Sequence, residues 1–149
     1  MTTYTATASE IALPTATDLT VMQLVSVTRS IVLTEWSVSF DGVTIADAPV
    51  TVSLYRQATT ASSGSSVTPS KRLAYASDAT TVVWSDPSSE PTLGELMETY
   101  YVTPAGGIVV MQYQEGAEIV SVDTERIGLV VNAPDGAVNA NVWMGWSEA

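Results

Sequence analysis

Two glutamates, Glu95 and Glu98, have the spacing that comes nearest to a catalytic pair in this sequence. Residues 92–98 predict one or two helical turns, with Thr92 as the cap and Glu95 at the capping-box position. Carboxylates three residues apart on such a turn share a face, and glycoside hydrolysis needs two carboxyl groups that flank a bond. We favour solvated helix-end charges instead, because a chain with 16 acidic residues contains such pairs by chance.

Two further patterns suggest chemistry that the sequence does not complete. Asp123, Glu125 and Asp135 lie in oxygen-rich turns, but no DxDxDG calcium loop is present, so ordinary turn capping by aspartate is favoured. Ser70 precedes Lys71 without the SxxK spacing, and no GxSxG motif exists. We therefore predict that the protein is not an enzyme and that it uses no metal or cofactor.

The composition excludes several other classes of site. The sequence contains no cysteine and no histidine, which removes disulfides, thiolate chemistry, histidine-based nucleophile systems and imidazole zinc sites. Its net charge is −11, from 5 basic and 16 acidic residues. Such a surface repels phosphate backbones, so we expect no nucleic-acid partner.

Neither the N-terminus nor the apolar runs indicate a membrane protein. The first residues lack the basic region and apolar core of a secretory signal. The longest uninterrupted apolar runs, such as residues 108–111, are far too short to span a bilayer. The sequence predicts a protein that is soluble, has no membrane partner, and is made and kept in the cytoplasm or released by lysis.

The elements that must position any site are strands. Trp36, Val38 and Phe40 alternate with polar residues, which predicts a strand with one buried face. About eight such segments follow one another, with turn signals every ten or so residues, and no βαβ alternation appears. This pattern predicts an all-β fold, an antiparallel, jelly-roll-like β-sandwich. We expect one sandwich domain over residues 21–149 and an extended N-terminal arm over residues 1–20.

A polar stretch at residues 57–70 interrupts the strand pattern. Cutting the chain there would leave about three strands before it, which is too few for an independent core. We interpret the stretch as a loop of one domain rather than as a linker. Deleting residues 59–66 should then leave a fold that melts cooperatively near its original temperature.

Surplus aromatic residues indicate candidate interface positions. In the last predicted strand, residues 137–146, alternation places five residues on an apolar face: Val138, Ala140, Val142, Met144 and Trp146. The opposite face carries Asn139, Asn141 and Trp143, which are available to a partner. Tyr100 and Tyr101 are adjacent, so one of them must point away from the core. The predicted interface set is completed by Tyr4 on the arm, whereas Trp36 and Trp84 are predicted to be core residues.

Four segments carry a resemblance to a known family: PVTVSLYRQATTASSGSSVTP (49–69), YVTPAGG (101–107), ERIGLVVNAP (125–134) and VNANVWMGW (138–146). Together they resemble the small all-β head decoration, or cement, proteins encoded beside the major capsid protein in many tailed bacteriophages. The resemblance implies a jelly-roll-like sandwich that is synthesised in the host cytoplasm and assembles as a homotrimer. It also implies a place on the exterior of the capsid, where the trimer binds the major capsid protein and stabilises the shell against DNA pressure.

Two other functions stay open at this stage. A trimeric phage fibre or receptor-binding tip is also β-rich, but the sequence shows no repetitive stalk. A carbohydrate-binding β-sandwich module would use a tryptophan platform, but no export signal or catalytic neighbour is visible. Binding to a glycan array would separate both alternatives from a cement protein.

Overall fold

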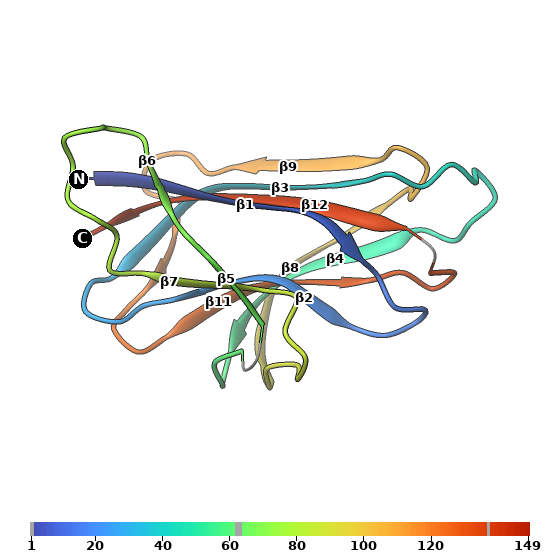
Figure 1. Cartoon of the computed structure of the whole chain (residues 1–149), viewed down its shortest axis with the longest axis horizontal. Helices are drawn as coiled ribbons and strands as arrows, with labels where there is room; N and C mark the ends of the chain where they lie inside the picture. Colours follow the sequence, from blue (N-terminus) through green and yellow to red (C-terminus); the bar gives the residue numbers. More distant parts are fainter. Residues whose placement is uncertain (1, 62–63, 137) are drawn as a thin grey trace.

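The computed structural model describes residues 2–61, 64–136 and 138–149, and it shows two antiparallel sheets packed face to face (Figure 1). The upper sheet of Figure 1 contains β1 (Thr2–Ala12), β3 (Ile31–Phe40), β6 (Ser70–Lys71), β9 (Ile108–Gln112), β10 (Ile119–Ser121) and β12 (Asn139–Glu148). The lower sheet contains β2 (Leu19–Val25), β4 (Val50–Gln57), β5 (Ser65–Val67), β7 (Val82–Ser85), β8 (Leu93–Val102) and β11 (Arg126–Asn132). The predicted all-β sandwich is confirmed.

The strand order is that of a jelly roll. In the upper sheet the order is β10-β3-β12-β1-β6, with β9 also paired to β3, and in the lower sheet it is β5-β7-β2-β11-β4-β8. Successive long strands alternate between the two sheets, except for β4 and β8, which pair with each other in the lower sheet, and this order is that of a double-sheet jelly roll. The described part of the chain has twelve strands rather than about eight, because the prediction did not include β1 or the short strands β5 and β6.

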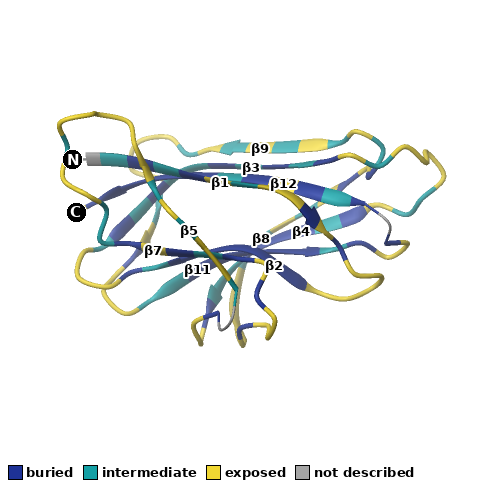
Figure 2. Ribbon diagram, in the orientation of Figure 1, coloured by how far each residue is buried: buried dark blue, intermediate teal, exposed yellow. Residues whose placement is uncertain are grey.

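The core lies between the sheets, and most residues of the central strands are buried (Figure 2). In β3 the buried residues largely alternate with half-buried ones. Trp36 and Trp146 are fully buried there, as predicted from their alternation. Trp84 differs from the prediction, because its neighbour Val83 occupies the inward position and leaves the indole half-buried on the outer face. A single short strand such as β7 can place only one of two adjacent large residues in the core.

The first twenty residues do not form a separate arm. β1 lies inside the upper sheet, where it pairs with β12 from Thr2 opposite Glu148 to Ala12 opposite Asn139, and with β6 along its other edge. Tyr4 and Ala6 point into the core. The sequence prediction failed here because small residues supply this inward face, so the segment lacks the large apolar residues that mark a buried strand.

The predicted helical turn at residues 92–98 is also absent, because these residues belong to β8. The strand pairs with β4 from Val50 opposite Val102 to Gln57 opposite Leu93, with two register shifts. In the loop before it, the Thr92 N–H donates to Thr59 Oγ1, at 2.8 Å, instead of beginning a helix. Pairing with β4 outweighs a local capping pattern, since tertiary context overrides weak helix propensity.

The two sides of the sandwich differ. On one side, the connection between β4 and β8 passes from the lower sheet through β5 to β6 in the upper sheet and returns through β7 (Figure 1). The described residues of the polar stretch, 57–61 and 64–70, are therefore part of a strap that closes this side, whereas residues 62–63 lie outside the described part of the chain. On the other side, β8 ends the lower sheet while β9 and β10 end the upper one.

Candidate interaction surfaces

Trp143 and Asn141 lie on the outer face of the upper sheet, opposite the buried Val142 and Met144. The Trp143 indole is half-buried, and the Arg72 guanidinium carbon lies 5.5 Å from its ring centroid. A cation placed over an aromatic face is attracted by the ring. The outward direction predicted for Trp143 is found, but Arg72 of the same chain already covers its ring.

The two asparagines of this strand are engaged within the chain. Asn141 is exposed, and its Oδ1 accepts a 2.8 Å hydrogen bond from the Glu10 N–H at a bulge of β1. The Asn139 backbone N–H and Nδ2 donate to the two carboxylate oxygens of Asp41, at 2.7 and 2.9 Å. These two hydrogen bonds hold the pKa of Asp41 below its usual 3.8, the backbone bond being the larger cause.

We predict that acid loosens the Asp41–Asn139 contact. A lowered pKa in the folded state means that the carboxylate stabilises the fold above its unfolded pKa, and that this stabilisation is lost as the pH falls through the lowered value. Amide hydrogen exchange at Asn139, compared between neutral pH and pH values below 3.8, should therefore show protection lost on acidification. Asp41→Asn should remove this pH dependence, and Asp47→Asn should leave it in place. Equal pH dependence in both variants would contradict the assignment.

The predicted tyrosines lie in three different environments. Tyr101 points outward from the lower sheet and is 77% exposed. Tyr100 points inward, 5.9 Å from the Trp36 ring, and burial, followed by the charge of Glu98, raises its pKa. Tyr4 is fully buried, and its hydroxyl donates to the Ser77 carbonyl at 3.0 Å, so a partner cannot reach its ring and the interface prediction for Tyr4 is wrong. Of the three, Tyr101 alone offers an open aromatic surface.

The loop between β3 and β4, residues 41–49, exposes two apolar side chains that sequence analysis did not single out. Val43 is 90% exposed and Ile45 is 88% exposed. The Asp41–Asn139 hydrogen bonds fix one end of the loop, and at the other end the Ala48 N–H donates to Asp135 Oδ2 at 2.6 Å. The available signal was the presence of β-branched residues in a turn, which otherwise favours small polar residues.

A close backbone approach sets the path of this loop. A Cβ on Gly42 would lie 2.3 Å from the Pro104 carbonyl oxygen, so only glycine fits there. The loop is thus attached to the 103–107 turn as well as to the last strand. We call Val43 and Ile45, together with the aspartates near the base of the loop (Asp41, Asp47 and Asp135), the apolar loop tip. Its two apolar side chains extend from a base held on three sides.

The basic residues of the chain are all engaged within it. Four of them form ion pairs. Arg29 pairs with Glu148, and Arg56 pairs with both Glu95 and Glu125. Lys71 pairs with Asp78, and Arg72 pairs with Glu35. Arg126 donates to Thr60 Oγ1 at 2.7 Å and to the Thr124 carbonyl at 2.9 Å. The surface offered to a partner is therefore dominated by carboxylates.

The carboxylates considered as catalytic or metal-binding residues are distributed over separate contacts. Glu95 pairs with Arg56, whereas Glu98 accepts from the Tyr113 hydroxyl at 2.8 Å. Glu125 accepts from the Val122 N–H at 2.9 Å and pairs with Arg56. In the residues that the structure describes, no three metal-ligating side chains come together, and no helix is long and apolar enough to cross a membrane.

Comparisons with known proteins identify no family. No family model matches the sequence, and no curated protein matches it significantly. Among solved structures, a chain of Desmodium yellow mottle tymovirus is similar, with a TM-score of 0.36 and 9% sequence identity. The match covers 99% of this chain and 87% of the viral one, but it is too distant to indicate a function.

Proposed function

We propose that this protein is a non-enzymatic decoration protein of a tailed-phage head, which binds the outer surface of the icosahedral shell as a homotrimer. The apolar loop tip is the observation that carries this proposal. Val43 and Ile45 are almost fully exposed on a loop whose base is fixed by hydrogen bonds. Exposed apolar groups on a rigid support are typical of a surface that a protein partner covers.

Decoration requires binding and no chemistry. A protein that binds only the mature shell stabilises it in proportion to its differential affinity. A trimer that engages several shell subunits at once gains further from multivalency. The acidic surface keeps the free protein soluble, and its charge favours a basic or neutral docking face on the shell.

The structure offers less support for a carbohydrate-binding module. Such a module needs an open aromatic platform, and the Arg72 side chain lies over the Trp143 ring. The other exposed aromatic side chains of the described chain include Tyr75 and Tyr101, which belong to different sheets or loops. We therefore retain the decoration function as the main proposal.

The test is binding to shells that lack the protein. Cosedimentation should show saturable binding, and Val43→Ser/Ile45→Ser should weaken it roughly tenfold to a hundredfold, because two aliphatic side chains would no longer be buried. The matched control is Val27→Ser/Val122→Ser, which alters two exposed valines in turns at the opposite end and should bind normally. Light scattering should give a mass three times 15.7 kDa. Failure of the unmodified protein to bind shells would overturn the proposal.

A further inference from the structure

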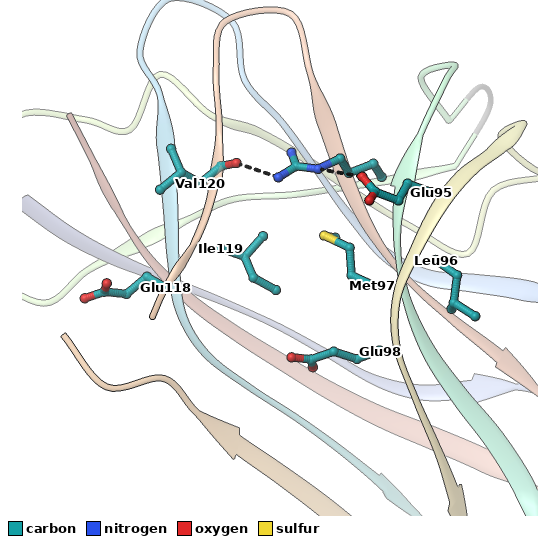
Figure 3. A pocket seen from close by; sticks show the side chains of 8 residues that line it. Glu95, Leu96, Met97, Glu98, Glu118, Ile119 and Val120 are labelled. Carbon is teal, nitrogen blue, oxygen red and sulfur yellow. Dashed lines mark hydrogen bonds and ion pairs between the residues drawn. The ribbon is translucent and has the colours of Figure 1, made fainter. Parts of the chain in front are cut away.

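The open side of the sandwich contains a groove between β8 and β10. It has a volume of about 540 Å³, and its lining includes four apolar residues: Leu96, Met97, Ile119 and Val120. Figure 3 shows Met97 and Ile119 pointing toward one another from the two strands. Leu96 and Val120 are exposed, and in Figure 3 their side chains point away from the groove, so Met97 and Ile119 supply its apolar centre.

Arg56 closes one end of the groove by joining the two sheets. It reaches from β4 to Val120 in the upper sheet, whose carbonyl accepts from its Nη2 at 3.0 Å. The same guanidinium pairs with Glu95 at 3.5 Å (Figure 3) and, outside the view of that figure, with Glu125 at 3.2 Å. Its charge is therefore shared between two carboxylates at this end of the groove.

The other end of the groove carries two carboxylates without a basic partner among the described residues. Glu98 accepts from the Tyr113 hydroxyl, at 2.8 Å, and Glu118 accepts from the Gly116 N–H, at 2.6 Å. Burial, the largest cause, raises the pKa of Tyr113, so this hydroxyl keeps its proton and its role as a donor. In Figure 3 both residues lie at the side of the groove opposite Arg56; the Glu98 carboxylate is directed across the groove, whereas the Glu118 carboxylate is directed away from it. The groove is thus apolar in its middle and negative at one end.

This pattern of charge selects among possible occupants. A second copy of this chain is a poor candidate, because all five of its basic residues are engaged in internal contacts. Addition of a partner strand to the β8 edge is also disfavoured, since the two register shifts against β4 and the carboxylates of β8 are features that protect an edge from pairing. The remaining candidate for the groove is a basic segment of a different protein that contacts it through side chains.

We propose that the β8–β10 groove binds a segment of another protein in which aliphatic residues flank a lysine or arginine. The aliphatic residues pack on Met97 and Ile119, and the cation lies beside the Glu98 carboxylate, while Glu118 adds negative charge at the same end of the groove. Long basic side chains suit such a site because their stems are apolar and their heads are charged. The proposal is independent of the shell, since it specifies the chemistry of the segment and not the protein that supplies it.

The probe is a hexapeptide, blocked at both ends, in which lysine alternates with leucine. Titration followed by backbone NMR should give saturable shifts confined to β8, β10 and their neighbours. Glu98→Gln/Glu118→Gln should weaken binding about tenfold, because the charge contact with Glu98 and the negative charge of Glu118 are lost while each amide can still accept its internal hydrogen bond. A peptide with serine in place of leucine should bind more weakly than the parent.

The matched control variant separates this site from general attraction to an acidic protein. Glu10→Gln/Asp86→Asn also removes two negative charges, but from exposed positions that do not line the groove. This variant should bind the peptide normally. Both variants should melt near the temperature of the unmodified protein. An equal loss in the two variants, or the absence of saturable binding, would overturn the proposal.

Discussion

Replacing Glu148 by alanine is expected to lower the free energy of unfolding by about 3–5 kcal/mol. The side chain is buried near the end of β12, where its Oε1 accepts from the backbone N–H groups of Thr80 and Thr81, each at 2.8 Å. Both threonine hydroxyls also donate to it, at 3.0 and 2.7 Å. Alanine would leave these donors without an acceptor in a region from which water is excluded.

Chemical denaturation measured at equilibrium tests this prediction. Glu115→Ala is the control, since Glu115 is exposed and its replacement should change stability by less than about 0.5 kcal/mol. Glu148→Gln should lower the free energy of unfolding by an intermediate amount. Its amide oxygen can still accept hydrogen bonds, but its amide nitrogen is itself a donor and would face the threonine donors. A loss below about 1 kcal/mol for Glu148→Ala would show that water or a rearranged loop replaces the carboxylate.

Deletion of residues 59–66 is expected to cost about 3 kcal/mol or more, contrary to the expectation from sequence. The buried Gln23 amide donates to the Thr59 carbonyl at 2.9 Å, and its Oε1 accepts from the Ala61 N–H at 2.7 Å. Gln23 also donates to Gln57 Oε1 at 2.7 Å, and Gln57 donates to Thr20 Oγ1 at 2.9 Å. The deletion would expose this network and remove two of its partners.

Thermal unfolding provides the measurement. Deleting residues 44–46, which are exposed in the loop between β3 and β4, serves as the control and should shift the melting temperature little. The 59–66 deletion should instead melt well below the original protein or lose its cooperative transition. If it melts within a few degrees of the original, the strap does not stabilise the sandwich.

Alternation of residue types made most of the fold predictable. In β3 and β12 the inward positions carry large apolar residues, and the turns between strands carry glycine, proline or aspartate. β1 escaped prediction because Tyr4 and Ala6 are flanked by threonines on both sides. β5 and β6 were unpredictable because two or three residues contain too little pattern.

The candidate surfaces were less predictable, for a different physical reason. The alternation of side chains along a strand is enough to predict that Trp143 points outward. It also predicts that Tyr100 and Tyr101 point to opposite faces of the sheet. The β8–β10 groove depends on which distant strands become neighbours, and Arg72 reaches Trp143 only through the strap. Glu148 resembles a solvated end of the chain in sequence, and only the position of residues 80–81 explains its burial.

The pairing of β1 with β12 has a consequence for the order of folding events. Thr2 lies opposite Glu148, so the centre of the upper sheet joins two segments from the extremes of this sequence. During synthesis β1 therefore leaves the ribosome long before β12 is made. It cannot form its pairing with β12 until the intervening residues have been synthesised. Contacts of such large sequence separation fold slowly. The weakly apolar composition of β1 limits the hydrophobic surface that this segment exposes before it pairs.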